Sequence, residues 1–305
     1  MTTMDLDALY AELRPLLFSI AYRMTGSVGD AEDIVQDAFV RFQRAERDQV
    51  ESPRAFLATV VTRLAIDHLR SARVRREAYV GEWLPEPLVS EDDDAAETAE
   101  SLSLAFLVVL ETLSPVERAV FLLRDVFGYE YGEIARIVGK TETNCRQIAT
   151  RARRHVEARR PRFEASREQQ EELADRFFAA CVDGDTDSLV ELLAGDVVVH
   201  GDGGGKAPQL AEPVHGADRA ARLLVGWFRT AAELGAELQR VTVNGRPGAV
   251  IRSPAGEIGS VMALDVAGGQ VQAVRSIVNP DKLRHLGPVA DVRAALRERG
   301  RRRER

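Results

Sequence analysis

The chain has 305 residues and a formal net charge of −7 at pH 7, with 45% hydrophobic and 29% charged residues. This length suits two or three domains of about 100–150 residues each, and the composition is that of a soluble globular protein. A negatively charged chain is not a general nucleic-acid coat, so any DNA contact must come from local basic clusters.

The cysteines and the apolar runs exclude further classes of protein. Cys145 and Cys181 are too few for a disulfide framework, and no spacing typical of metal ligands is present. The first residues lack the pattern of a signal peptide, and no apolar run approaches the roughly 20 residues that span a bilayer. We therefore expect a cytoplasmic protein with no cofactor, no metal and no membrane contact.

Residues 5–77 are predicted to be almost wholly helical. Apolar residues recur at helical spacing between Leu6 and Ala21, where Pro15 predicts a kink or a split. After a turn at residues 26–29, Asp30 is expected to cap a second helix over residues 31–45. The polar side of that helix carries Asp33, Gln36, Asp37 and Arg41.

A third helix is predicted to begin at Ser52 and Pro53, with proline near the first helical position. Its basic side chains are Arg63, His68, Arg70, Arg73 and Arg76. The next segment, residues 82–100, is acidic and contains prolines that restrict its backbone. We interpret it as a linker with a docking segment, Trp83, Leu84 and Pro85; the alternative is a flexible hydrophilic spacer.

Residues 102–156 predict a second helical block. A helix over residues 116–127 follows Ser114 as cap and Pro115 at the first position. Residues 128–156 then predict two helices joined by a tight turn. Gly139 ends the first of these, and Thr141 caps the second, which starts near residue 142.

The last of these helices carries side chains suited to DNA. Asn144, Arg146 and Gln147 lie near its start, where polar groups can reach base edges in a major groove. The cationic side chains further on can neutralise phosphates; they are Arg151, Arg153 and Arg154. The pattern favours helix-turn-helix DNA binding over a solvated helix hairpin.

The second half of the chain has a different pattern. Helices are predicted over residues 171–182, 188–193 and 217–234, and strands over residues 196–200, 237–243, 249–252, 258–266 and 270–278. Gly268 and Gly269 are a hairpin signal. Helices followed by antiparallel strands predict an α+β domain. The arginine-rich residues 297–305 are expected to be disordered.

Two blocks of the first half resemble a known family. DAEDIVQDAFVRF with SPRAFLATVVTRLAIDHLRSARVRRE resembles the second region of bacterial extracytoplasmic-function (ECF) RNA polymerase sigma factors. LSPVERAVFLLRDVFGYEYGEIARIVGKTETNCRQIATRARRHV resembles their fourth region. Two blocks in the right order, with a linker between them, are far more specific than a lone helix-turn-helix.

The resemblance implies a role for each block. Asp33, Gln36, Asp37 and Arg41 would contact the clamp helices of the β′ subunit of core RNA polymerase. Residues 43–52 and the following basic helix would meet the promoter −10 element, where such factors capture an unpaired base. The helix-turn-helix is assigned to the −35 element, and part of its domain to the polymerase β flap.

The second half resembles SnoaL-like domains, which have a nuclear transport factor 2-like cone. Two polar segments sharpen the resemblance: DGGGK, which is Asp202, Gly203, Gly204, Gly205 and Lys206, and NPDKL, which is Asn279, Pro280, Asp281, Lys282 and Leu283. With WLPEP at residues 83–87, they resemble the SigJ-like group of ECF sigma factors. There, the fused SnoaL-like domain substitutes for a separate anti-sigma protein.

Our hypothesis is that DGGGK and NPDKL lie near the linker and hold the two DNA-binding domains in a closed arrangement. Both segments are turn-like and polar, and neither suits a hydrophobic core. Candidate acid/base groups of a cone enzyme are His200, Asp202, Lys206, His215 and Asp265. We favour a regulatory domain without catalytic residues; whether the cone holds a small ligand stays open.

The sequence thus predicts a multidomain protein with two all-α sigma domains and an α+β cone domain. The expected parts are region 2 (1–80), a linker (81–100), region 4 (101–160), the SnoaL-like domain (168–287) and a basic tail (288–305). The expected partners are core RNA polymerase and promoter DNA. The alternatives are a helix-turn-helix regulator that needs no polymerase, and a SnoaL-like cyclase, isomerase or hydrolase with a regulatory N-terminal half.

Overall fold

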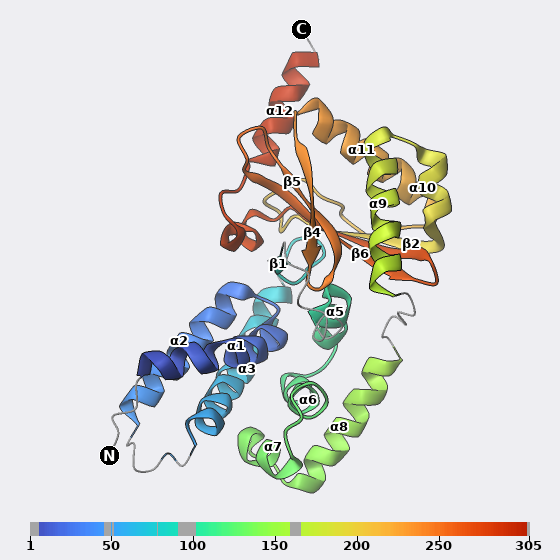
Figure 1. Cartoon of the computed structure of the whole chain (residues 1–305). Helices are drawn as coiled ribbons and strands as arrows, with labels where there is room; N and C mark the ends of the chain where they lie inside the picture. The colour runs from blue at the N-terminus through green and yellow to red at the C-terminus, as the bar shows by residue number, and fades with distance from the viewer. Residues whose placement is uncertain are drawn as a thin grey trace. The chain divides into compact units, whose positions relative to one another are not determined.

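The structure, a computed structural model, describes residues 6–45, 50, 52–77, 79–90, 102–158 and 166–303, with the backbone alone at 72–77 and 302–303. It divides into two compact units. Residues 1–78 and 107–160 form the N-terminal unit, and residues 79–106 and 161–305 form the C-terminal unit (Figure 1). The acidic run at residues 91–101 and the bridge at residues 159–165 lie outside the described residues.

Three long helices open the N-terminal unit: α1 (Leu6–Thr25), α2 (Val28–Arg44) and α3 (Pro53–Glu77). Pro15 lies inside an unbroken α1, so the predicted split is wrong. Packing of α1 against α2 and α3 outweighs one missing backbone N–H. The predicted cap of α2 is also wrong, because the hydroxyl of Ser27 accepts the N–H of Asp30 at 3.2 Å and starts the helix earlier.

The next helices are α5 (Leu104–Glu111), α6 (Pro115–Phe121), α7 (Tyr131–Val138) and α8 (Glu142–Glu157). Ser114 caps α6 in a capping box with Glu117, which confirms the predicted start. The helix predicted over residues 116–127 does not stay α-helical throughout. From Leu122 to Val126 it becomes the π-helix η3, where the N–H of Phe127 reaches the carbonyl of Leu122 at 3.0 Å.

One twisted sheet holds the strands described in the C-terminal unit, in the order β1-β4-β5-β6-β7-β2-β3. Its strands are β1 (Val89–Ser90), β2 (Leu193–Asp202), β3 (Val214–His215), β4 (Glu237–Val243), β5 (Arg246–Arg252), β6 (Ile258–Ala267) and β7 (Gln270–Ile277). Neighbours run antiparallel except β2 and β7. The predicted strands are confirmed, whereas β1 and β3 are two-residue strands without an alternating pattern and were not predicted.

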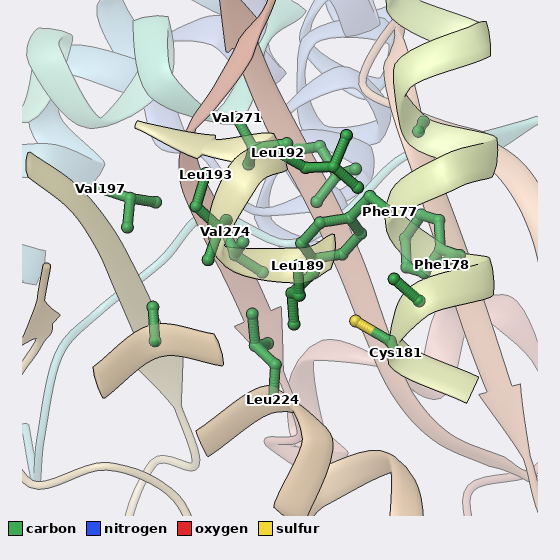
Figure 2. Packing of buried hydrophobic residues seen from close by; sticks show 14 of the residues in the cluster. Phe177, Phe178, Cys181, Leu189, Leu192, Leu193, Val197, Leu224, Val271 and Val274 are labelled. Carbon is green, nitrogen blue, oxygen red and sulfur yellow. The ribbon is translucent and has the colours of Figure 1, made fainter. Parts of the chain in front are cut away.

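Three helices cover one face of this sheet: α9 (Arg167–Asp183), α10 (Thr186–Leu192) and α11 (Ala217–Glu233) (Figure 1). Figure 2 shows the core between them, where Phe177 and Phe178 of α9 meet Leu189 of α10 and Leu224 of α11. Val274 of β7 closes this core from the sheet, and all five side chains are buried. The α+β architecture predicted for this half is therefore confirmed.

The chain after β7 folds back along the sheet. Two short 3-10 helices, η4 (Pro280–Lys282) and η5 (Arg284–Leu286), precede the helix α12 (Val292–Arg303). Disorder from residue 297 is therefore a wrong prediction for the described residues, because Arg299 Nε is 2.6 Å from Glu233 Oε2 and ties α12 to α11. Across the described ranges, no helix is long and apolar enough to cross a membrane.

Candidate regulatory and nucleic-acid-binding sites

The two-helix motif of the N-terminal unit has the predicted caps. Gly139 ends α7 in the left-handed conformation, with φ of 67°. Thr141 then starts α8, because its hydroxyl accepts the N–H of Asn144 at 3.2 Å. The inner side of α8 buries Cys145 and Ile148 against α7. This packing fixes the outer side of α8 as one exposed polar surface.

Five of the six residues predicted to contact DNA on α8 are exposed: Asn144, Arg146, Gln147, Arg151 and Arg154. Arg146 lies 4.5 Å from the ring centroid of Tyr131, a cation–π distance that orients its guanidinium. Arg153 differs from them, because its Nε donates to Asp125 Oδ1 at 3.0 Å. Arg153 must therefore leave or share this carboxylate to reach a phosphate.

The outer side of α2 carries the predicted polymerase-binding residues. Asp33, Gln36, Asp37 and Arg41 are all exposed. Each lies between buried positions of the same helix, such as Ile34 and Ala38, that fix the orientation of this side. The structure thus places the four side chains on one solvent-facing surface.

The basic residues of α3 lie in different environments. His68 Nε2 is 3.2 Å from Asp30 Oδ2, and Arg70 pairs with Asp67 at 3.0 Å. Arg63 donates to the carbonyl oxygens of Ile137 at 2.9 Å and Arg136 at 2.8 Å. Side chains of Arg73 and Arg76 lie outside the described residues. Arg63 therefore caps the C-terminal end of α7, a favourable place for a cation.

A buried arginine makes a second connection between these helices. Arg118 of α6 donates to the carbonyl oxygen of Leu110 at 3.0 Å and to that of Met24, the latter on α1. Its guanidinium also pairs with Glu111 at 2.7 Å. Burial lowers the pKa of Arg118 to about 9, so it stays charged at pH 7. The helix-turn-helix and the first three helices thus pack together within the N-terminal unit.

The linker is anchored in the C-terminal unit by one carboxylate. Asp202, at the end of β2, is fully buried and accepts the hydroxyl of Tyr79 at 2.5 Å and the N–H of Leu84 at 2.8 Å. Lys282 Nζ lies 2.6 Å from the same side chain. Burial and the Asp202 carboxylate raise the pKa of the Tyr79 hydroxyl, which keeps it a donor. We call these four residues the linker anchor.

Lys282 is the cation that pairs with the Asp202 carboxylate, and it makes further contacts with the linker. Its ammonium also donates to the carbonyl oxygen of Leu84 and lies 4.2 Å from the ring centroid of Trp83. Asn279 adds a bond from its amide to the Tyr79 hydroxyl at 2.7 Å. Asp202, Asn279 and Lys282 are thus buried polar residues with polar partners, and none of them belongs to the hydrophobic core between the sheet and its helices.

The glycines of DGGGK allow the close approach of this loop to the anchor. Gly204 has φ of 55°, and a Cβ there would overlap the side-chain amide of Asn279. A Cβ at Gly203 would overlap the carbonyl of Ala207. Lys206 and Asp281 join the two motifs by an exposed ion pair. Glycine is therefore required here for space as well as conformation.

The rest of the linker extends the sheet. Val89 pairs with Val243, so β1 covers the edge of β4. The turn after β4 contains Asn244, with φ of 51°, a conformation that asparagine tolerates. Its side chain accepts the N–H of Leu88 at 2.9 Å and donates to the carbonyl of Leu102 at 2.9 Å. One asparagine thus binds both ends of the linker segment that the structure leaves undescribed.

The acid/base candidates of the cone lie in separate pairs. His200 Nδ1 contacts Glu82 of the linker at 2.7 Å, and Asp265 pairs with buried Arg275, whose pKa burial lowers to about 10. His215 is an exposed residue of β3, and Asp202 and Lys206 have the partners given above. None of the five lines the large cavity of this unit that the described residues form. The geometry therefore does not bring them to one reaction centre.

Three families match successive parts of the chain. Sigma-70 region 2 matches residues 9–75, Sigma-70 region 4 matches residues 103–156, and the SnoaL-like domain matches residues 174–278. The chain is also 40% identical over 305 residues to the ECF RNA polymerase sigma factor SigJ of Mycobacterium tuberculosis (strain ATCC 25618 / H37Rv). That alignment covers 96% of this chain and 97% of SigJ. The chain belongs to the ECF RNA polymerase sigma factors.

A further relative and a solved structure agree with this membership. A probable ECF RNA polymerase sigma factor SigI of M. tuberculosis is 34% identical over 283 residues, covering 91% of this chain and 94% of the relative. The crystal structure of M. tuberculosis SigJ has a TM-score of 0.75 at 36% identity, covering 93% of this chain and 99% of that one. The predicted family, the fold and the sigma factor function are thus confirmed.

Sequence reasoning about this sigma factor missed several residues of the site. Tyr79, Glu82, Asn244 and His285 all bind the linker to the SnoaL-like domain; His285 Nε2 lies 2.8 Å from the carbonyl of Pro87. These residues have no shared motif, and 156 positions separate Leu88 from its partner Asn244. The available signal was the position of Glu82 and His285, which are polar residues close to the WLPEP and NPDKL motifs.

Proposed function

We propose that the SnoaL-like domain regulates this sigma factor in cis by holding the linker between regions 2 and 4. The observation that carries the proposal is the linker anchor, in which buried Asp202 accepts hydrogen bonds from Tyr79 and Leu84 and pairs with Lys282. Loss of one partner of a buried carboxylate costs about 3–5 kcal/mol, because the charge is then left buried without compensation. Release of the linker therefore requires a specific competing interaction.

The linker is a suitable point of control because it joins both promoter-binding regions. A linker held by the cone limits the separation that regions 2 and 4 can adopt. Arg63 supports such a restraint, because its guanidinium is bound to the end of α7 in the described state. Binding to polymerase would require both this contact and the linker anchor to open. Opening of the contact would make Arg63 available to the −10 element.

We further propose the promoter and polymerase contacts of the two regions. Exposed Asn144, Arg146 and Gln147 suit base edges of the −35 element, and Arg151 and Arg154 suit its phosphates. The exposed side of α2 with Asp33 and Asp37 suits the clamp helices of β′. Part of region 4 would bind the β flap.

A regulatory rather than catalytic cone is supported by the positions of its ionisable groups. Two candidate acid/base groups are held by other side chains, His200 by Glu82 of the linker and Asp265 by Arg275, and none of the five candidates lines the cavity that the described residues of this domain form. A catalytic acid or base needs to reach a substrate. We therefore assign His200 to linker binding.

Run-off transcription with purified core polymerase tests the proposal. The full chain is compared with a version ending at residue 160, with Lys282→Ala and with Lys206→Ala. Lys282 is buried in the linker anchor, whereas Lys206 forms an exposed pair worth little energy. We expect specific transcripts from the full chain, and a change in their amount with K282A and the shortened version but little with K206A. Equal transcription by K282A and the full chain, with equal affinity for core polymerase, would refute regulation by the anchor.

A further inference from the structure

The SnoaL-like domain contains a large cavity that the contacts described so far do not use. Its volume is about 810 Å³, within the range of pockets for drug-sized molecules. Side chains of α11, the strands β5 to β7 and α12 line it. Most are apolar, among them Leu210, Trp227, Phe228, Ile251 and Met262. A molecule placed there would be held mainly by burial of apolar surface.

A few uncharged polar groups face the same space. Gln209 Nε2 donates to the hydroxyl of Ser276 at 3.2 Å, and both residues line the cavity. Ser260 and Thr230 also contribute to its wall. Hydroxyl and amide groups can donate or accept, so a ligand with one hydroxyl, carbonyl or amine could be oriented without carrying charge.

Charged groups among the described lining residues are either exposed or already hydrogen-bonded within the protein. Glu233 and Glu298 are exposed, and Glu233 pairs with Arg299 at 2.6 Å. Arg252 donates to the side chain of Gln239 at 3.0 Å and the carbonyl of Gly256 at 3.1 Å. An ionised ligand would find little compensation in the apolar interior, where an unpaired charge is costly. The lining thus favours a neutral molecule.

The helix α12 covers the cavity and also touches the DGGGK loop. Val292, Ala295 and Leu296 line the cavity, whereas Arg293 on the same helix donates to the carbonyl of Gly205 at 3.1 Å. Figure 1 shows α12 beside α11 at one end of this domain, in agreement with the ion pair between them. A ligand that shifts α12 therefore acts on the loop that follows Asp202.

The strands give a second connection between the cavity and the linker anchor. Ser276 and Val278 line the cavity, and the next residue, Asn279, binds the Tyr79 hydroxyl. The N–H groups of Val278 and Asn279 both donate to the carbonyl of Asp202, at 2.9 and 3.1 Å. A displacement of the wall at the end of β7 is thus transmitted through two backbone hydrogen bonds to the residue that holds the linker.

We infer that this cavity binds a neutral, mainly apolar small molecule with one hydrogen-bonding group, and that its occupancy alters the linker anchor. The binding step stands by itself, whereas the effect on the linker rests on the regulatory function proposed above. The ligand enters beneath α12 and contacts Gln209 and Ser276 at the inner end. The SnoaL-like domain then acts as a sensor that links a small molecule to the linker of the sigma factor.

A neutral fluorescent dye tests the binding step on the full chain. N-phenyl-1-naphthylamine is apolar, carries a single N–H and becomes brighter in an apolar site. We expect saturable binding of one dye per chain. Ala231→Trp, which places an indole in the cavity, should weaken binding at least about tenfold. The adjacent exposed residue gives the matched control, since Ala232→Trp should leave affinity within about twofold.

Equal dye affinity of A231W and A232W would overturn the assignment of the cavity. If A231W lowers the melting temperature, the pair Ala295→Trp and Ala294→Trp on α12 makes the same comparison, because Ala295 lines the cavity and Ala294 is exposed. Hydrogen exchange of residues 79–90 with and without the dye then tests the link to the anchor. A changed exchange rate at Leu84 supports the link between the cavity and the linker anchor. An unchanged rate when the chain is saturated with dye overturns this link, whatever the transcription experiment shows.

Discussion

The substitution Tyr79→Phe is expected to loosen the linker anchor without disturbing the core of the SnoaL-like domain. The lost hydroxyl donates to Asp202 at 2.5 Å and accepts the amide of Asn279 at 2.7 Å. A hydrogen bond to a charged acceptor contributes about 1.5–3 kcal/mol. Since about 1.4 kcal/mol is a factor of ten, the equilibrium constant for opening of the anchor should rise about 10- to 150-fold.

The amide of Leu84 reports this opening directly. The N–H of Leu84 donates to Asp202 at 2.8 Å, and Leu84 is only 1% exposed. This N–H therefore exchanges with solvent only when the anchor opens. In the Y79F protein, exchange at Leu84 should accelerate by the same 10- to 150-fold, as about 1.5–3 kcal/mol of lost stabilisation requires. The measurement is hydrogen–deuterium exchange of the full chain, followed on the peptide that contains residues 79–90.

Two comparisons make this test decisive. Tyr10→Phe is the matched control, because the Tyr10 side chain is 40% exposed and lies in the other unit. The amide of Val274, in the buried core of the sheet, shows whether the whole domain has been destabilised. If Leu84 exchanges in Y79F within about twofold of the unmodified chain, the hydroxyl contributes too little for the anchor as described.

Three further predictions concern stability and reactivity. Arg118→Ala should lower the free energy of unfolding of the N-terminal unit by about 3 kcal/mol in urea titrations, because it leaves Glu111 and two carbonyls without a buried cation. Arg151→Ala, the control, should change this free energy by less than about 0.5 kcal/mol. Equal effects of the two substitutions would contradict the stabilising role of Arg118. Gly204→Ala and Gly268→Ala should each lower the stability of the fold by about 1 kcal/mol, because both positions have a left-handed backbone. In thermal melts G204A should be the less stable of the two, because its Cβ also overlaps Asn279, whereas a Cβ at Gly268 meets open space. Burial raises the pKa of Cys181 to about 12. The neutral thiol therefore makes its full contribution to the stability of the fold below about pH 9, and this contribution is lost as the pH rises through about 12. Iodoacetamide should therefore not label Cys181 at pH 9 in the native chain, and rapid labelling detected by mass spectrometry would argue against its burial.

Local signals predicted the elements of this fold well. The end of α7 at Gly139 and the start of α8 at Thr141 depend on residues within one turn, and both predictions are confirmed. The strand β4 was predicted with its observed bounds, Glu237–Val243. In contrast, the two-residue strand β1 forms only because β4 offers an open edge, which no local pattern indicates.

The candidate sites were predictable only in part for the same physical reason. The exposed side of α8 follows from helical spacing, so Asn144 and Arg151 could be placed from the sequence. The partners of a buried polar residue come from distant positions, as the bond between Arg63 and the carbonyl of Ile137 illustrates. Likewise, the turn-like DGGGK segment did not indicate that Asp202 is buried, because the three partners that make burial favourable come from other parts of the chain.

The sequence separation within the linker anchor gives the proposed regulation an order in time during protein synthesis. Leu84 and Lys282 are 198 positions apart, so both regions 2 and 4 are complete long before Lys282 is translated. Region 4 ends at residue 156, and the following residues up to Lys282 take about 6–25 s to translate at about 5–20 residues per second. During this interval the emerging sigma regions have no anchor to restrain their linker. A chain whose translation stops before residue 282 would stay unrestrained, so the restraint also distinguishes finished molecules from incomplete ones.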